Sequence, residues 1–287
     1  MKIRSASAEK DRKSAFTPRQ HARSAFTLPE PRGRHDLTLP EPRGRYAFTL
    51  VELLIVMGII AILMVLVAPA FTNLKSAGDV TGAAYTIKGV LDQARTYAMA
   101  NNTYTWVGFY EEDVSTESTT PKATAGTGRV VMSIVASKDG TTIYDPSSPA
   151  KITTTQLIQV GKLTKVDNAH LWTHTDTPLT PTGSTFDYRP NVTSTYCIGN
   201  TSPPNSTTQF QYPVGNPEPA AQYTFVKAVQ FSPGGEARID NNSYSLQTAA
   251  EIGLEPTHGN AAPSSIPANV VAIQFAGVGG NVKIYRR

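Results

Sequence analysis

The chain has 287 residues, a formal net charge of +4 and a single cysteine, Cys197. The length supports one or two domains with a hydrophobic core. One cysteine excludes an internal disulfide and any zinc site built on several thiolates, and we expect Cys197 to be a small buried or loop thiol. Positions 1–47 hold 11 of the 26 Lys and Arg residues but only 5 of the 22 Asp and Glu residues. The rest of the chain is therefore slightly acidic, which argues against a nucleic-acid-binding face on a folded domain.

Residues 1–47 are basic, contain prolines and have almost no long apolar run, which is a composition typical of disorder. An 11-residue repeat, with Thr-Leu-Pro-Glu-Pro-Arg-Gly-Arg in each copy, occupies 24–34 and 35–45. Its period is far below that of a solenoid, and two prolines in each copy break helices. We therefore predict that this segment is a disordered basic leader. Its positive charge is typical of the cytoplasmic side of a membrane segment.

An uncharged run of 18 residues, LLIVMGIIAILMVLVAPA, follows from Leu53 to Ala70. As a helix with a rise of about 1.5 Å per residue it is roughly 27 Å long, close to the thickness of a bilayer core. We therefore predict a transmembrane helix over 48–73. Pro69 is expected to bend this helix or to mark its exit from the membrane.

A second helical pattern covers 74–102. Its apolar residues recur at spacings of three and four, which predicts an amphipathic helix whose stripe packs on a globular head. The stripe consists of Val80, Ala83, Ala84, Ile87, Val90, Leu91, Ala94 and Ala98.

Residues 103–287 show the alternation of strands and are predicted to form a β-rich head. The fold class is therefore α+β, with a long N-terminal helix packed on an antiparallel sheet. The predicted strands are Tyr104–Glu111, Arg129–Ser137, Gln156–Val166, Tyr223–Phe231, Glu236–Ile239, Asn269–Ala276 and Asn281–Arg286.

Two insertions interrupt this pattern, at 114–128 and 173–222. Both are rich in Thr and Ser, and the second also has many Pro and Asn residues. A structureless loop of fifty residues is unusual in a compact domain. The second insertion is either a decorated surface loop or contains short strands.

Glu52 is the anomalous residue at the start of the apolar run. A carboxylate near the edge of a membrane helix costs up to about 3 kcal/mol and should have a partner. The first lysine after it is Lys75, so no cation lies nearby on the same helix. Cleavage between Ala47 and Phe48 would create an ammonium group at Phe48, four residues before Glu52. That group is a candidate partner, in the same chain or in a neighbouring one.

The segment AFTLVELLIVMGIIAIL resembles the N-terminal signal of type IV pilins and type II secretion pseudopilins. The resemblance implies that a prepilin peptidase cuts before Phe48 and methylates its amino group, and that Glu52 is used for assembly. It also matches Pro69 to a proline that the family often carries. Ala47 replaces the usual glycine but keeps a small side chain, and a leader of 47 residues is long for the family.

The head is similar to that of H-type minor pseudopilins, the GspH/FimT group. The similarity lies in VLDQARTYAMANN, FSPGGEARI and GVGGNVKIYRR. It implies a minor subunit with no cofactor, located in the inner membrane with its N terminus cytoplasmic and its head periplasmic. Its partners would be the peptidase, other pilin or pseudopilin subunits and membrane lipid.

Three alternatives are weaker. An ordinary signal peptide would be cut after Ala70 and would release a soluble β protein beginning at Phe71. An enzyme is not indicated, because His170 and His174 lie in a predicted strand and loop, where we expect exposed polar residues rather than half a metal site. DNA uptake would use Lys283, Arg286 and Arg287, but three cations give only weak, salt-sensitive affinity, so nucleic acid is not expected as a partner.

Overall fold

The computed structural model describes residues 48–116, 123–142, 154–174, 183–199, 206, 208–215, 221–241 and 245–287, without the side chains of 66–77. The chain divides into two compact units, Met1–Leu54 and Ile55–Arg287. The predicted leader 1–47, including Ala47, lies outside the described residues.

Helix α1 runs without interruption from Leu50 to Ala100. Its C-terminal half is amphipathic as predicted, because all eight residues of the expected stripe, from Val80 to Ala98, are buried. Four of the eight are alanines, which let the helix backbone approach the strands closely. Near the end of the helix, the hydroxyl of Thr105 donates to the carbonyl of Ala94 at 3.1 Å and joins the helix to the first strand.

Sheet A is fully antiparallel and carries the longest strands. Its order is β3 (Leu157–Asp167), β2 (Gly128–Ser137), β1 (Thr105–Asp113), β8 (Lys227–Phe231) and β9 (Ala237–Ile239). In β1, alternate residues face opposite sides of the sheet, as the geometry of a strand requires.

Sheet B is built around β10 (Ala250–Pro256), and a smaller sheet C has two strands. Sheet B has the order β12 (Val282–Arg286), β11 (Val271–Phe275), β10 and β4 (Ala169–Leu171), and β5 (Cys197–Ile198) pairs with β10 in parallel. Sheet C pairs β6 (Phe210–Tyr212) with β7 (Tyr223–Phe225). Three short 3-10 helices are η1 (Thr154–Gln156), η2 (Thr185–Tyr188) and η3 (Ser194–Tyr196).

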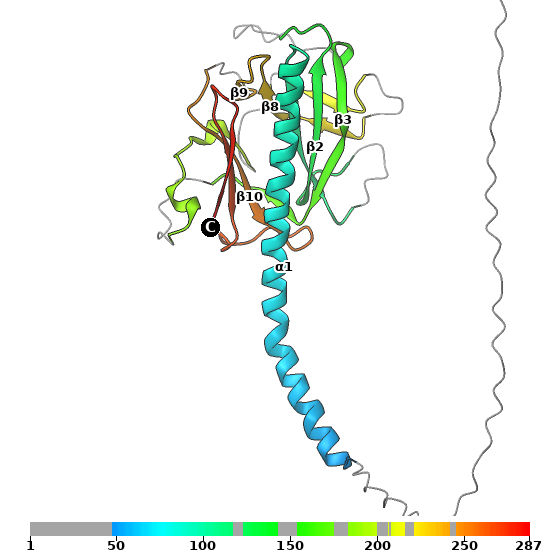
Figure 1. Cartoon of the computed structure of the whole chain (residues 1–287). Coiled ribbons are helices and arrows are strands. Elements are labelled where there is room, and N and C mark those ends of the chain that lie inside the picture. Colours follow the sequence, from blue (N-terminus) through cyan, green and yellow to red (C-terminus); the bar gives the residue numbers. More distant parts are fainter. Residues whose placement is uncertain are drawn as a thin grey trace, which may run out of the picture. The chain divides into compact units, whose positions relative to one another are not determined.

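The main core lies where α1 meets one face of sheet A and one face of sheet B. Figure 1 shows α1 alongside β2 and β3 on one side and β10 on the other. The opposite face of sheet A carries a second cluster under sheet C, with Trp106, Phe210 and Phe225. The opposite face of sheet B carries a third, in which Phe186 of η2 packs on Val270 and Ala272. Both sheets are therefore covered on both faces.

Gly108 shows how closely sheet C lies on sheet A. A Cβ atom at this position would lie 2.6 Å from the side chains of Phe210 and Phe225. Real Cβ contacts are longer than this, so any larger residue at position 108 would push the two aromatic rings away from the strand.

Several strand predictions are corrected by the structure. The predicted strand Tyr223–Phe231 is two strands, because β7 pairs with β6 in sheet C and β8 pairs with β1 in sheet A. Strand β4 corresponds to the strand expected around His170, whereas β5, β6 and β10 lie outside the predicted strands. The other predicted strands are present, with bounds that differ by one or two residues.

The insertion 173–222 contains short strands, and the alternative of a surface loop is wrong for its described part. Phe186, Ile198 and Phe210 are each at most 1% exposed. These three side chains contribute to the third, first and second clusters, respectively. Within 114–128, Ala125 forms an isolated bridge with Glu112, and β2 begins at Gly128.

Candidate functional site

The first candidate site is the start of α1, where Thr49 and Glu52 form a capping box. The Oε2 atom of Glu52 accepts hydrogen bonds from the backbone N–H and the hydroxyl of Thr49, both at 2.9 Å. In return, Thr49 Oγ1 accepts the backbone N–H of Glu52 at 3.2 Å. This reciprocal pair satisfies donors that a helix start leaves without intrahelical partners.

Thr49 thus supplies Glu52 with a hydrogen-bond partner in its own helix, whereas the expected pairing of Glu52 with the ammonium group of Phe48 remains a prediction. The Thr-Leu-Val-Glu spacing is the sequence signature of a capping box, and it could have been recognised from the sequence. Both contacts use Oε2, and Oε1 of Glu52 accepts no hydrogen bond from any residue that the structure describes. The carboxylate is therefore positioned by its own chain and retains an oxygen for a second partner.

The helix that follows is apolar and exposed on every side. All residues from Phe48 to Val65 are exposed, with Phe48 at 82% and Leu50 at 80%. An amphipathic helix would expose polar residues on one side and bury apolar residues on the other. This segment instead exposes apolar residues on all sides, which is the pattern of a helix that is surrounded by an apolar phase or by other helices.

In the part of the chain that was described, no helix meets the length and hydropathy required of a membrane span. The apolar run continues to Ala70, and its side chains beyond Val65 lie outside the described residues. The same is true of the side chain of Pro69, so its predicted bend remains a prediction, although α1 continues through this position.

A junction in the head brings together the three segments that carry the pseudopilin resemblance. Arg95 of α1 donates from Nε to the carbonyl of Gly235 at 3.3 Å. A Cβ atom at Gly280 would lie 2.4 Å from that same carbonyl oxygen and 3.0 Å from the Arg95 side chain. The backbone N–H of Ala237 donates to the carbonyl of Gly277 at 2.8 Å. The helix and the two glycine-rich turns are thus packed directly on one another.

A partly buried cluster of ionisable side chains connects the two large sheets. His170 of β4 pairs through Nδ1 with Glu111 of β1. Lys227 of β8 donates to the carbonyl of Gly199, and Glu255 of β10 lies opposite His170 in the strand register. Burial lowers the pKa of Lys227, an effect that Glu111 partly opposes. Burial also raises the pKa of Glu255 to about 7, and His170 opposes part of this shift.

The two histidines are buried, and the expectation that they are exposed polar residues is wrong. His170 is 6% exposed and His174 is 4% exposed. The ring of His174 packs edge-on against Phe186 with 5.0 Å between centroids. Burial, together with the positive charge of Arg189, lowers its pKa to about 4. The strand pattern could not show this burial, because the elements that cover both histidines are distant in sequence.

Glu255 should make the stability of the head depend on pH. In the folded state the pKa of its carboxyl group is about 7, whereas the ordinary pKa is 4.5. Between these two pH values the folded state therefore binds more protons than the unfolded state. The free energy of unfolding then falls as pH rises. Glu255→Gln removes this charge. We expect the stability of the variant relative to the wild type to rise across this interval, by roughly 3 kcal/mol at pH 7, since a tenfold change in proton affinity corresponds to about 1.4 kcal/mol.

The measurement is urea unfolding of the full chain in detergent from pH 4 to pH 8. His174 acts in the opposite direction, because its lowered pKa makes stability fall as pH decreases from 6.5 towards 4. It is present in both proteins and cancels in the difference. A difference between variant and wild type that does not change with pH would contradict the prediction.

The three C-terminal cations do not form one surface. Lys283 and Arg286 lie in β12, and residues three apart on a strand face opposite sides. Val282 and Ile284 pack against the main core, whereas Tyr285 packs against the third cluster. Arg286 therefore lies on the side of the main core, and Lys283 and Arg287 lie on the other side.

Metal-binding side chains are not gathered anywhere in the described ranges, where no group of three or more His, Cys, Asp or Glu residues could hold an ion. Cys197 is buried and is not part of a disulfide, which confirms the expectation of a small buried thiol. Its Sγ lies 3.4 Å from the carbonyl oxygen of Thr193.

Comparison with protein families identifies the N-terminal segment. Residues 42–68 match the model of the prokaryotic N-terminal methylation motif. The match includes Phe48 and the Thr49–Glu52 capping box. This segment is a type IV pilin-like signal. The match does not extend to the head, and comparisons with curated proteins and with solved structures find no match to this chain.

Proposed function

We propose that the protein is a minor pilin or pseudopilin, a structural subunit and not an enzyme, which assembles through its N-terminal helix into a type IV pilus or a type II secretion pseudopilus. The single observation that carries this proposal is the methylation motif at 42–68. It coincides with a helix start that is capped by Glu52 and followed by an apolar surface exposed on every side.

In the proposed sequence of events, the leader stays in the cytoplasm and the helix from Phe48 inserts into the inner membrane, so that the head is periplasmic. The peptidase then cuts between Ala47 and Phe48 and methylates the new amino group. During assembly, apolar helices pack together and exclude water and lipid. Glu52 then pairs with the ammonium group of Phe48, because a lone carboxylate at this depth costs up to about 3 kcal/mol.

The structure supports this pairing in one specific way. The capping box fixes the position of the Glu52 side chain through Oε2, and Oε1 is free of described partners. A carboxylate that is already held loses little side-chain entropy when it meets a cation on a neighbouring helix. The two roles, capping and pairing, are therefore compatible.

A minor rather than a major subunit is proposed from the head. The segments that resemble H-type pseudopilins meet at the junction of Arg95, Gly235 and Gly280. This contact explains why each motif has these residues. The arginine donates a hydrogen bond to one turn, and the glycines leave room for the two turns to touch. The insertion 173–222 then adds cover to both sheets of this proposed framework.

Mass spectrometry of the mature N terminus tests the proposal. The full gene would be expressed with a prepilin peptidase, and the protein would be purified from membranes. We expect a chain that begins at methylated Phe48. An Ala47→Leu variant, which replaces the small residue before the cut, should accumulate uncut.

Two outcomes would overturn the proposal. A chain that begins at Phe71 would indicate an ordinary signal peptide that releases a soluble protein. A native chain that retains residues 1–47 in the presence of active peptidase would exclude processing at this motif.

A further inference from the structure

The segment that connects β10 to β11 contains an exposed loop without charged residues, 259–268, which we call the base loop. No Asp, Glu, Lys or Arg occurs from Gly259 to Val282. All residues of the base loop except Pro263 and Pro267 are exposed, and Ile266 is its largest apolar side chain, at 39% exposed. None of them belongs to a helix or a strand. An exposed isoleucine in an uncharged loop is a surface that a weakly polar partner would fit.

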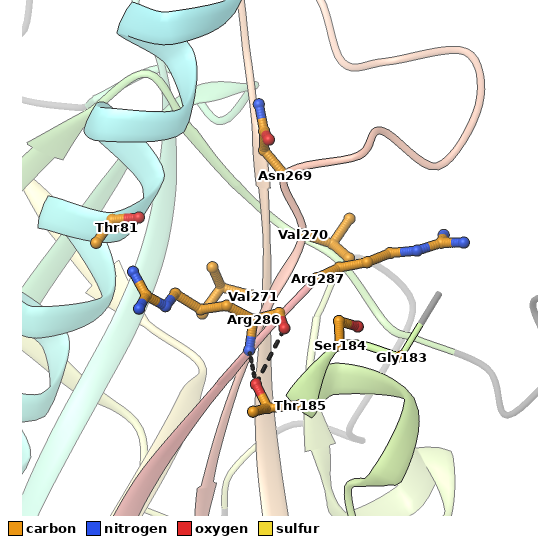
Figure 2. A pocket seen from close by; sticks show the side chains of 9 residues that line it. All are labelled: Thr81, Gly183, Ser184, Thr185, Asn269, Val270, Val271, Arg286 and Arg287. Carbon is orange, nitrogen blue, oxygen red and sulfur yellow. Dashed lines mark hydrogen bonds between the residues drawn. The ribbon is translucent and has the colours of Figure 1, made fainter. Parts of the chain in front are cut away.

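Both ends of the base loop are fixed beside the turn of α1 at which the head begins. On one side, the N–H of Thr257 donates to the carbonyl of Asn168 at 3.1 Å, and the amide of Asn168 donates to Asp79 of α1 at 3.0 Å. On the other side, Asn269 lines a cavity of about 490 Å³ together with Thr81 and the end of β12 (Figure 2). Figure 1 shows the segment after β10 at the end of the head from which the exposed part of α1 extends.

The length of helix below Asp79 sets the distance from the base loop to the bilayer. This step rests on the proposed function, which places the apolar run up to Ala70 in the membrane. Helix α1 is continuous, so the nine residues from Ala70 to Asp79 rise by about 14 Å. A headgroup layer is about 5–8 Å thick on each side of the hydrocarbon core. The remaining gap is therefore roughly 6–9 Å, whereas a ten-residue loop that is fixed at both ends can project up to about 16 Å.

The chemistry of the base loop determines how deep it can enter. Its irregular backbone excludes it from the hydrocarbon core, where groups without hydrogen bonds are too costly, but the headgroup layer offers water and polar partners. Ile266 loses contact with water there, and no charge has to be desolvated. Two acidic residues near the ends of the loop, Asp79 and Asp113, accept hydrogen bonds from Asn168 and Ser115. Their charges would resist an anionic surface, so the loop fits a zwitterionic layer better.

We propose that the base loop lies in the headgroup layer of the bilayer that holds the helix, with Ile266 as its inserted side chain. A single isoleucine would bind a membrane only weakly by itself. The head is already tethered by α1, however, so this contact forms within one molecule at a high effective concentration. The contact holds the head with its base against the membrane and with the turn at 277–280 directed away from it.

Methyl NMR of the full wild-type chain in phosphatidylcholine nanodiscs tests this contact. A fraction of the lipid would carry gadolinium at the headgroup, which broadens the signals of nearby methyl groups. We expect loss of the Ile266 methyl signal. Val278 is the internal control, because it is 76% exposed and its turn contacts Arg95, which lies fourteen residues, or about 21 Å, beyond Thr81 along α1. Its methyl signals should remain.

A second label separates this inference from the proposed function on which it rests. Lipid with a nitroxide in its acyl chains should broaden the methyl signals of Ile59 and Ile62 if the helix is inserted. Unaffected signals of these two residues would overturn both proposals. Broadened helix signals with an unchanged Ile266 signal would overturn the base-loop contact alone. Equal loss at Ile266 and Val278 would also overturn it, because the head would then have no fixed orientation. Protection of Ile266 from a water-soluble gadolinium chelate, without any effect of the lipid label, would assign the loop to a protein partner instead.

Ile266→Asn tests the inserted side chain. In wild-type protein the methyl signals of Ala262 and Ala268 should also be broadened by the headgroup label, and in the variant most of this loss should be recovered. Val278→Asn is the matched control and should leave both alanine signals as broad as in the wild type. Replacing half of the lipid by phosphatidylglycerol should not strengthen the contact. A stronger contact that added salt removes would assign it to charge and contradict the role of Ile266.

Discussion

Replacing Glu52 by alanine is expected to reduce incorporation of the protein into filaments at least tenfold, while cleavage before Phe48 and membrane insertion proceed normally. The variant loses both the capping box with Thr49 and the proposed pairing with the Phe48 ammonium group. Loss of a helix cap costs about 1 kcal/mol. An unpaired charge in an apolar helix bundle costs about 3–5 kcal/mol, so the pairing should decide the result.

Two further variants separate these contributions. Glu52→Gln removes the charge but keeps a side chain that can serve in a capping box. Thr49→Ala removes the cap but keeps the carboxylate. If pairing dominates, Glu52→Gln should assemble as poorly as Glu52→Ala, and Thr49→Ala should assemble nearly as well as the wild type.

The measurement is the ratio of the variant in sheared filaments to that in membranes, together with the mass of its N terminus. Normal incorporation of Glu52→Ala would exclude the proposed role in assembly. A strong defect in Thr49→Ala with normal Glu52→Gln would instead assign the effect to the helix cap. A failure of processing in any variant would be visible in the mass and would concern the peptidase.

Phe210→Ala is expected to destabilise the head by about 3–5 kcal/mol, the usual cost of removing a buried aromatic side chain. Phe210 is 1% exposed, and its ring centroid lies 5.0 Å from that of Phe225. The ring lies directly over Gly108, which has no side chain to fill the resulting space. The loss should therefore not be recovered by local collapse.

Tyr188→Ala is the control, because Tyr188 belongs to the same insertion but is 76% exposed. It should change the free energy of unfolding by no more than about 0.5 kcal/mol. Both variants would be unfolded with urea as full chains in detergent, with the fluorescence of Trp106 as a probe, since this tryptophan is fully buried in the same cluster. Equal small effects of the two variants would show that the insertion contributes little to the core.

The α1 stripe was predictable because its cause is local. Positions three and four apart on a helix share one face, so the spacing from Val80 to Ala98 identified the buried residues before any partner was known. The long strands β2 and β3 were also predictable from their β-branched residues. The capping box was equally local, because it needs only the spacing of three residues between Thr49 and Glu52.

Strand β10 shows why the rest could not be predicted. It lies at the centre of sheet B, yet its sequence, Ala-Glu-Ile-Gly-Leu-Glu-Pro, contains residues that are uncommon in strands. Glu251 is accommodated because Arg189, a residue of the insertion, pairs with its carboxylate at 2.9 Å. Glu255 lies opposite His170 in the strand register. Those partners come from segments that are distant in the sequence, so the pattern of β10 alone indicates a loop.

The sequence by itself determined the pilin-like signal, since a capped helix start and an apolar helix depend only on residues that are neighbours along the chain. It also determined which face of the later helix is buried. Only the tertiary structure decided that the insertion 173–222 covers both sheets, that both histidines are buried, and that Arg286 and Arg287 flank one cavity. The physical reason is that burial and charge compensation at these sites depend on residues from distant segments, and folding alone brings those segments together.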